Sequence, residues 1–297
     1  MGRHSAYNGD MPDLFRHIAA CNNAVLPGGR LPFRLDGTQV GWVLPDLAAA
    51  LVPHGATWDS TGWDSTGRDS IGRDGAGADL AAGRLEAAVR ALSEAGRFRW
   101  RGEAFDVRAD PDGPALATMD RGALPAFGIW AAGVHLNGLV ERADGTWVWV
   151  ARRAADKLLD PGKLDHIVGG GVPAGLTPLQ CLAKEAAEEA AIPADLIAAA
   201  QPVAVLSYAM DRPEGLRRDV LHCYDLPLPE SFEPQPADGE VEAFELWPLP
   251  RALDRMRDTD DFKFNVNLVL IDLGLRRGLI GGDEGRRLRA ALDAPAL

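Results

Sequence analysis

The sequence predicts an α+β protein of two units: a small α+β unit over residues 1–123, then a unit over 124–297 in which a mixed β-sheet lies between helices. Its 297 residues reach the length at which single cores stop growing, about 250–300 residues. A hydrophobic content of 46% and a charged content of 25% are typical of a globular chain. The order strands, helix, strands, helices lacks the regular βα alternation of a doubly wound parallel fold.

The first unit is expected to contain short helices and short strands. Leu14, Ile18 and Cys21 recur at helical spacing, and an Asp-Gly turn separates two strand candidates that follow them. The expected helices cover residues 13–26, 46–52 and 79–96, and the expected strands lie within 31–44 and 98–107.

A five-residue repeat interrupts this unit between residues 58 and 77. It reads WDSTG, WDSTG, RDSIG and RDGAG. Four short copies rich in Gly, Asp and Ser cannot bury an apolar core, so we interpret the repeat as a flexible insertion.

From Phe127 onward the chain contains longer apolar segments. Strands are expected over 127–141 and 147–153, on either side of a second Asp-Gly turn, and a helix is expected over 178–191. The remaining expected elements are strands near 202–210, 218–225 and 241–247 and helices near 249–258, 263–277 and 282–292.

The charge balance excludes one large class of partner. The chain has 31 Lys and Arg against 43 Asp and Glu, a formal net charge of −12, whereas a nucleic-acid-binding face needs clustered cations. No stretch approaches the roughly 20 apolar residues of a membrane helix, and the first residues lack the apolar core of a signal peptide. Cys21, Cys181 and Cys223 form no CxxC motif, so we expect three reduced thiols in a cytoplasmic protein, either monomer or homodimer.

The segment with the strongest chemical signal is the helix expected after Thr177. Thr177 is a good N-cap, and Gln180 completes a capping box with it. The helix then presents Glu185, Glu188 and Glu189 at spacings that place all three on one face. Hard oxygen ligands at this density suit Mg²⁺ or Mn²⁺, although an acidic string on a helix is more often an ordinary solvated face.

A glycine triplet just upstream favours the metal-binding interpretation. Residues 169–171 are all Gly, and a loop without side chains can approach the helix closely. The whole segment resembles the Nudix box, G-x5-E-x7-R-E-U-x-E-E-x-G-U, with Gly170 at its first position and the three glutamates at the metal ligands. Four positions depart from the pattern: Leu176 for its first Glu, Lys184 for Arg, Ala186 as a small aliphatic residue, and Ala191 for the late Gly.

The flanking sequence resembles one Nudix subfamily in particular. Its members carry an N-terminal domain of unknown function (DUF4743-like) and are similar to the Nudix part of fungal thiamine pyrophosphokinases. FRHIAACNNA and VGWVLPDLAAAL fit the N-terminal domain, and FKFNVNLVLIDLGLRRGLI fits the end of the Nudix domain. The resemblance implies a Mg²⁺- or Mn²⁺-dependent hydrolase of a small organic or nucleoside diphosphate, with thiamine diphosphate or its damaged analogues as candidate substrates.

The resemblance also assigns residues to the site. Glu185, Glu188 and Glu189 would bind the metal and activate water. An acidic residue beyond the box often joins them in the family, and Glu242 is the first candidate here, with Glu240 beside it and Glu245 behind. Substrate phosphates also need cations and backbone amides, for which the candidates are Arg152, Arg153, Lys157, Lys163, Gly169 and Gly170.

Two other functions are open to a chain with this pattern. A non-catalytic Nudix-fold sensor or binding module usually loses box glutamates, whereas this chain keeps three. An isomerase of allylic diphosphates would carry a Cys on the early strand, which here reads GVHLNG. The hydrolase is therefore the expected function, and the sensor is the alternative.

Overall fold

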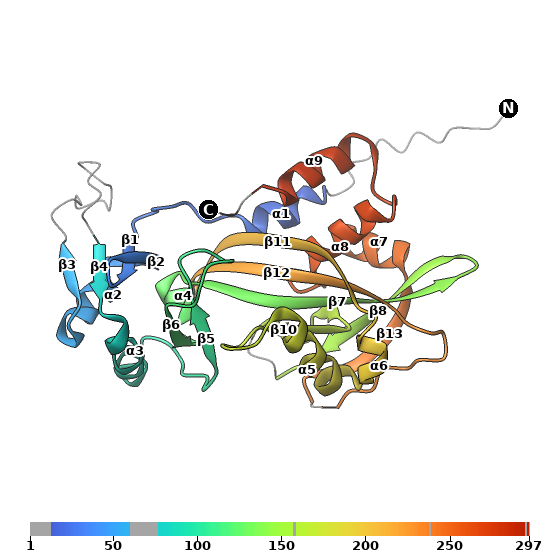
Figure 1. The fold of residues 1–297 in the computed structure, drawn as a ribbon. Coiled ribbons are helices and arrows are strands. Elements are labelled where there is room, and N and C mark those ends of the chain that lie inside the picture. Colours follow the sequence, from blue (N-terminus) through green and yellow to red (C-terminus); the bar gives the residue numbers. More distant parts are fainter. Residues whose placement is uncertain (1–12, 60–76, 157–158, 238, 295, 297) are drawn as a thin grey trace.

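The computed structural model describes residues 13–59, 77–156, 159–237, 239–294 and 296, which form two lobes lying side by side (Figure 1). The expected α+β class is confirmed. Among the described residues, no helix is long and apolar enough to cross a membrane.

The smaller lobe is a four-stranded sheet covered by helices, with a separate hairpin beside it. The sheet order is β2-β1-β4-β3, in which β1 and β4 run parallel and the other pairs are antiparallel. Its elements are β1 (Leu31–Leu35), β2 (Thr38–Val43), α2 (Pro45–Leu51), β3 (Thr57–Asp59), β4 (Gly77–Leu80), α3 (Leu85–Glu94), the hairpin strands β5 (Ala104–Val107) and β6 (Ala117–Asp120), and α4 (Leu124–Phe127).

Three expectations for this lobe were wrong in their boundaries. The helix expected from residue 79 begins at Leu85, because Gly77–Leu80 is the strand β4 and a 3-10 turn follows it. The strand expected over 98–107 is ordered as β5 only from Ala104. The ends of the pentapeptide segment belong to the sheet, since Trp58 pairs with Ala78 and Asp59 with Gly77. Residues 60–76 lie outside the described residues.

The larger lobe is built on a mixed sheet in the order β11-β12-β7-β8-β13, to which β10 is added through β7 and β9 through β8. Strands β7 and β12 are parallel, and the other pairs are antiparallel. The strands are β7 (Trp130–Arg142), β8 (Gly145–Arg153), β9 (Leu164–His166), β10 (Val168–Gly171), β11 (Gln201–Arg212), β12 (Gly215–Pro227) and β13 (Val241–Pro248).

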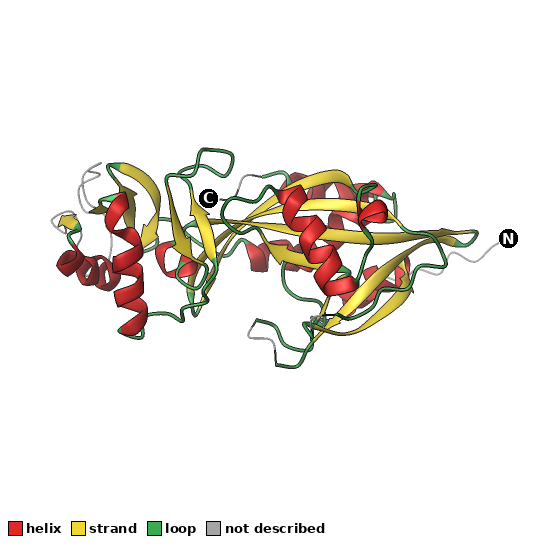
Figure 2. Ribbon diagram, turned by 60° about the horizontal axis from the view of Figure 1, so that its bottom comes forward, coloured by secondary structure: helices red, strands yellow, loops and turns green. Residues whose placement is uncertain are grey.

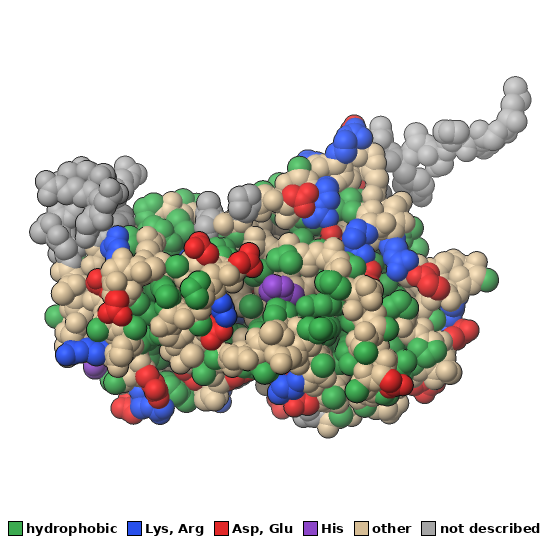
Figure 3. All heavy atoms as spheres, viewed as in Figure 1, with side chains coloured by type: hydrophobic (Ala, Val, Ile, Leu, Met, Phe, Trp, Pro, Cys, Tyr) green, Lys and Arg blue, Asp and Glu red, His purple; other side chains and the backbone are tan. Residues whose placement is uncertain are grey.

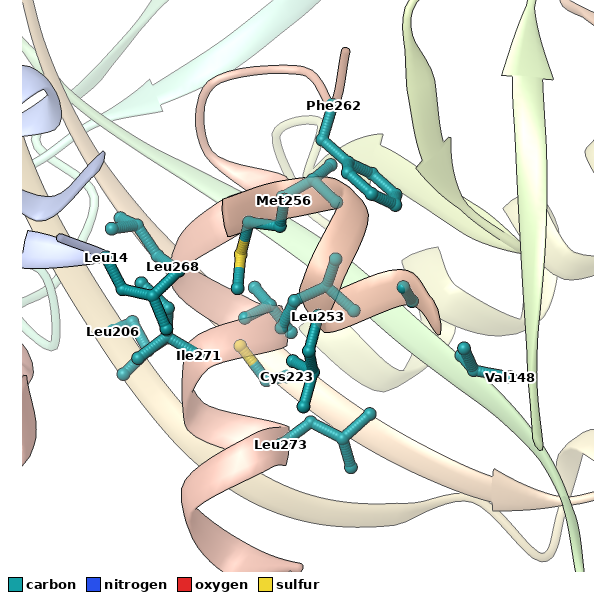
Figure 4. Packing of buried hydrophobic residues seen from close by; sticks show 14 of the residues in the cluster. Leu14, Val148, Leu206, Cys223, Leu253, Met256, Phe262, Leu268, Ile271 and Leu273 are labelled. Atoms are coloured by element: carbon teal, nitrogen blue, oxygen red, sulfur yellow. The ribbon is translucent and has the colours of Figure 1, made fainter. Parts of the chain in front are cut away.

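Helices cover both faces of this sheet, as the turned view also shows (Figure 2). On one face α5 (Pro178–Ala190) and α6 (Ala194–Ile197) enclose an apolar cluster with Leu136, Ile167 and Leu226. On the other face lie α7 (Leu249–Asp258), α8 (Val266–Arg276) and α9 (Gly282–Leu292). Figure 4 shows how Leu253, Met256, Ile271 and Leu273 fill the space between these helices and the sheet.

The first helix, α1 (Phe15–Cys21), does not pack in the small lobe. Leu14, Ile18 and Cys21 are buried in the cluster formed by α7, α8, α9 and the large sheet. In Figure 1, α1 lies beside α9 above β11, far from the strands that follow it in sequence. The N-terminal residues of the small unit are therefore part of the core of the large one.

Buried charge holds the C-terminal helices together. Asp272 of α8 is 1% exposed, and its carboxylate accepts from Arg276 at 2.7 Å and from Arg289 of α9 at 2.6 Å. Arg276 also donates to Asp225 of β12 at 2.6 Å. These two arginines thus connect α8 to both α9 and the sheet.

We predict that Asp272→Ala lowers the free energy of unfolding by about 2–3 kcal/mol, because it removes the buried carboxylate that Arg276 and Arg289 share and leaves each with its second partner, Asp225 or Asp293. Urea unfolding followed by circular dichroism measures the change. The matched control is Asp283→Ala in α9, whose carboxylate is 95% exposed and pairs only with Arg286 among the described residues, and it should change stability by less than about 0.5 kcal/mol. Equal effects of the two variants would contradict the prediction.

Candidate active site

The helix α5 begins as the sequence predicts. The Thr177 side chain accepts from the Gln180 amide at 3.3 Å, and the Gln180 side chain accepts from the Thr177 amide at 2.9 Å. The capping box satisfies two backbone donors at the start of the helix. It fixes the helix axis and therefore the face on which the three glutamates lie.

The glycine triplet forms the short strand β10, which pairs antiparallel with β7 and passes close to α5. The Gly169 amide donates to Glu189 Oε2 at 2.9 Å. A Cβ on Gly170 would lie 2.7 Å from Cδ of Glu185, a distance that side chains do not adopt. Gly170 is therefore required for the Glu185 carboxylate to lie against the loop.

Burial makes two of the three carboxylates hard to ionise. Glu189 is 7% exposed, and burial raises its pKa to about 8 in spite of the Gly169 hydrogen bond, with the charges of Asp165 and Glu185 adding to the rise. Burial also raises the pKa of Glu185. Glu188 is half exposed. Carboxylates in this state gain from a cation placed among them, and their hard oxygen donors fit Mg²⁺ or Mn²⁺.

Lys184 supplies a positive charge to the same face. Its ammonium donates to Glu188 at 2.6 Å and to Glu185 at 3.2 Å, and these hydrogen bonds raise the pKa of Lys184. Leu176, at the position of the first box Glu, packs against the apolar cluster under α5. At these two departures from the box, Leu176 therefore makes an apolar contact, and Lys184 pairs with two of the candidate metal ligands, Glu185 and Glu188.

The acidic candidates beyond the box lie at different places along β13. Glu240, just before the strand, contributes to the raised pKa of Glu189 and so lies within electrostatic reach of it. Glu242 is exposed at the irregular position between Val241 and Ala243. Glu245 accepts from Trp247 Nε1 at 2.9 Å. Of the three, Glu240 is the one whose charge acts on a box glutamate, Glu189.

The cations expected to bind substrate do not gather at the glutamates. Arg153 is largely buried, and its guanidinium donates to Asp165 at 2.7 Å and to the carbonyls of Leu159 and Asp160 at 2.9 and 3.1 Å. These contacts brace the loop that precedes β9. Lys157 lies outside the described residues.

Arg152 and Lys163 line a pocket of about 760 Å³ between that loop, β13 and α7. Trp247, Arg251 and Glu245 also line it, and the box glutamates do not. Its rim mixes both signs of charge, as does the face of the molecule seen in Figure 3. In this pocket the two cations therefore lie with Glu245 and not with the box glutamates.

A buried polar cluster, which the sequence did not predict, lies beneath the glycine loop. His135 Nδ1 is 3.0 Å from His166 Nδ1, and Asn265 Nδ2 is 3.3 Å from His135 Nε2. Asp165 is paired with Arg153 and, at 3.4 Å, with Lys263. Burial would raise the pKa of Asp165, but these two cations outweigh burial and lower it. We refer to these residues as the histidine cluster.

The donor atoms of His135, Asp165 and His166 lie within 4.8 Å of one another, which is close enough for three ligands of one metal ion. The charge argues against such an ion, because Arg153 and Lys263 already neutralise Asp165 and would repel it. The cluster lies directly under the glycine loop, since a Cβ on Gly169 would be 3.3 Å from His135 Nδ1. Its role is to support the backbone that holds Glu189.

One feature of the sequence could have indicated this cluster. In the segment GVHLNG, His135 and Asn137 alternate with apolar residues in a strand that is covered on both faces. Polar side chains on such a strand need buried partners. The partners, however, come from segments distant in the chain, and their identity follows only from the fold.

Comparison with known proteins finds a match for each of the two parts of the chain. Residues 133–267 match the family model of the NUDIX domain, and residues 13–131 match that of a domain of unknown function, DUF4743. Two relatives from Arabidopsis thaliana are Nudix hydrolase 24, chloroplastic, and Nudix hydrolase 20, chloroplastic. Each aligns with 61% of this chain, at 41% sequence identity over 180 residues. The matched region is 49% and 48% of those two proteins, so the chain spans about half the length of these relatives.

A solved structure, that of DR0079 from Deinococcus radiodurans, aligns with 57% of this chain and 97% of its own at 21% identity, with a TM-score of 0.44. The resemblance inferred from the sequence is confirmed for the Nudix and DUF4743 domains. The link to thiamine pyrophosphokinases stays a prediction.

We predict that His135 and His166 lower the stability of the protein as the pH falls below about 6.5, against an opposite and smaller contribution from Glu189, whose raised pKa gives the folded chain one extra proton. Burial lowers the pKa of His166 to about 4 and that of His135 well below 6.5, so the unfolded chain takes up protons in this range that the folded chain does not. Each such proton contributes a slope of about 1.4 kcal/mol per pH unit. Urea unfolding between pH 4.5 and 7 should give a flatter slope of stability against pH for His166→Gln than for the unaltered protein, and equal slopes would contradict the prediction.

We predict that Gly170→Ala weakens binding of Mn²⁺ by at least about tenfold, because the new methyl group displaces the Glu185 carboxylate. Isothermal titration calorimetry measures the affinity. Gly281→Ala is the matched control, since a Cβ there meets no atom within 4 Å and its φ of −143° is ordinary. Unchanged affinity in Gly170→Ala, with its fold intact by circular dichroism, would show that Glu185 is not held by this contact.

Proposed function

Because the chain joins a DUF4743 domain to a Nudix domain, we propose that it is a metal-dependent hydrolase that cleaves the diphosphate linkage of a small molecule. The observation that carries the proposal is the contact between the glycine loop and α5. Gly169 binds Glu189, and Gly170 makes room for Glu185, so two carboxylates converge at one end of the loop. A solvated acidic face would need neither contact.

The three box glutamates differ in how firmly they are held, and this difference suggests separate roles. Glu185 and Glu189 have little freedom to move, since one lies against Gly170 and the other is bound by Gly169. Glu188 is half exposed and restrained only by Lys184 among the described residues. A divalent cation bound here would neutralise phosphate charge and lower the pKa of the attacking water. Glu185 or Glu188 would accept the proton of that water.

The substrate we propose is a small organic or nucleoside diphosphate. Hydrolysis of a phosphoric anhydride by positioned carboxylates and metal does not depend on the group beyond the phosphates, so the box itself leaves that group open. Thiamine diphosphate and its oxidised analogues come first in a substrate panel, because the flanking segments resemble fungal thiamine pyrophosphokinases. Nucleoside diphosphate compounds make up the rest of the panel.

We predict that the protein releases phosphate-containing products from at least one member of this panel in the presence of Mg²⁺, and that Glu188→Gln lowers kcat by at least about 100-fold. The substitution preserves shape at a half-exposed position, so the fold should survive. Product release is followed by chromatography. Glu86→Gln in α3 of the small lobe, an exposed glutamate paired with Arg90, is the matched control and should retain full activity.

Two outcomes would contradict this proposal. Unchanged activity in Glu188→Gln would show that the box carboxylates do not catalyse the reaction. Tight binding of a panel member without turnover, in the unaltered protein, would instead favour the sensor.

A further inference from the structure

The hairpin β5–β6 of the small lobe lies directly against the catalytic loop. The Ala174 amide donates to the carbonyl of Ala104 at 2.8 Å. Phe105 is buried, and a Cβ on Gly171 would lie 2.6 Å from its Cζ. Gly171, the last residue of the glycine triplet, thus leaves space for the Phe105 ring of the small lobe.

A buried carboxylate shapes this end of the hairpin. Asp120 is 5% exposed and accepts from the amides of Arg101, Gly102 and Gly122 at 2.9, 2.7 and 2.9 Å. A Cβ on Gly122 would lie 1.9 Å from the carbonyl oxygen of Arg99, so the two segments touch through their backbones. Asp120 therefore brings the chain around residue 101 next to the chain around residue 121.

This arrangement gathers three arginines, Arg99, Arg101 and Arg121. Burial lowers the pKa of Arg101, and the charges of Arg121 and Arg99 lower it further, as expected for neighbouring cations. Arg121 donates to Glu103 at 2.9 Å. Among the described residues, neither Arg99 nor Arg101 makes an ion pair with an acidic side chain. The carboxylate of Asp120 is taken up by backbone amides, so the group keeps an excess of positive charge.

The arginines lie beside the metal-binding face rather than elsewhere on the hairpin. Glu103 contributes to the raised pKa of both Glu185 and Cys181, which places its carboxylate within electrostatic reach of α5. A Cβ on Gly171 would lie 3.4 Å from Cζ of Arg121, and the preceding residue, Gly170, is the one that faces Glu185. Arg121 also lies over the ring of Phe105, at 5.5 Å from its centroid.

A purely structural role accounts poorly for this group. The Arg121 and Glu103 side chains are 50% and 34% exposed, and an ion pair so open to water contributes little to stability. Three clustered guanidinium groups repel one another, and an anion bound among them removes that repulsion. The neighbouring carboxylate face is likewise proposed to bind an anion, the diphosphate substrate, together with a metal ion.

We propose that the DUF4743 domain completes the substrate site: Arg121, positioned by Glu103 and Phe105 and flanked by Arg99 and Arg101, binds the phosphate of the diphosphate substrate that lies farther from the box glutamates. The location of the reacting phosphate rests on the proposed function. A guanidinium matches phosphate oxygens with two parallel hydrogen bonds, which an ammonium cannot do. Arg121 is thus a substrate-binding residue that the Nudix box itself does not contain.

The test compares Arg121→Gln, Arg121→Lys and Arg90→Gln in the full chain. Arg90 is a matched control, since it is an exposed arginine of the small lobe that pairs with Glu86 and stacks on Trp100. With the substrate found in the panel, Arg121→Gln should raise KM by about tenfold or more and change kcat by less than about twofold. Arg121→Lys should recover part of the loss, and Arg90→Gln should behave as the unaltered protein.

A second measurement keeps this proposal separate from the hydrolase itself. Methylenediphosphonate, whose carbon bridge cannot be hydrolysed, is titrated with Mg²⁺ into each protein in a calorimeter. Arg121→Gln should bind it about tenfold more weakly than Arg90→Gln does. Equal binding and equal KM in the two variants would overturn the role of Arg121, even if Glu188→Gln is inactive and the hydrolase therefore stands. If no panel member is hydrolysed, the proposed hydrolase fails, and the titration alone still decides whether Arg121 binds a diphosphate.

Discussion

The close approach of the glycine loop to α5 is the constraint on which the rest of the site depends. The Gly169 amide donates to Glu189, and Glu185 can lie against Gly170 only because residue 170 carries no side chain. Pairing of β10 with β7 holds the loop from one side, and the capping box fixes the helix on the other. The helix spacing brings the carboxylates to one face, and the paired loop is needed to hold Glu185 and Glu189 against the backbone.

The second requirement is electrostatic. Burying Glu189 beside Glu185 and Asp165 destabilises the charged form of all three, and the protein offsets this with cations placed around them. Arg153 and Lys263 neutralise Asp165 below the loop, and Lys184 lies above it on the exposed side of α5. The acidic face is therefore balanced from below by fixed cations and remains open from above, where a metal and an anionic substrate would enter.

Much of this could be predicted from the sequence, and the exceptions have clear causes. The capping box and the three glutamates are local patterns, and the structure has them as expected. Short strands such as β10 carry no periodicity that favours a strand, since glycine is a poor strand former and only pairing with β7 defines it. The histidine cluster was missed because contacts such as that of His135 with Asn265 join residues 130 positions apart. Lys263 and Asn265 likewise lie close together in the chain, but their partners Asp165 and His135 lie on the distant strands β9 and β7.

The glycine triplet also explains why the two domains of this chain form one structure. Each glycine makes room for a different neighbour: Gly169 for His135 of the histidine cluster, Gly170 for Glu185 of α5, and Gly171 for Phe105 of the small lobe. The box pattern accounts for Gly170, and nothing in the chemistry of the metal requires Gly171. That position is instead set by an aromatic ring from a domain that the sequence places upstream as a separate unit. Because α1 is in turn buried in the core of the large lobe, the small lobe is anchored at both of its ends, and its hairpin cannot leave the glycine loop without exposing Phe105 to water.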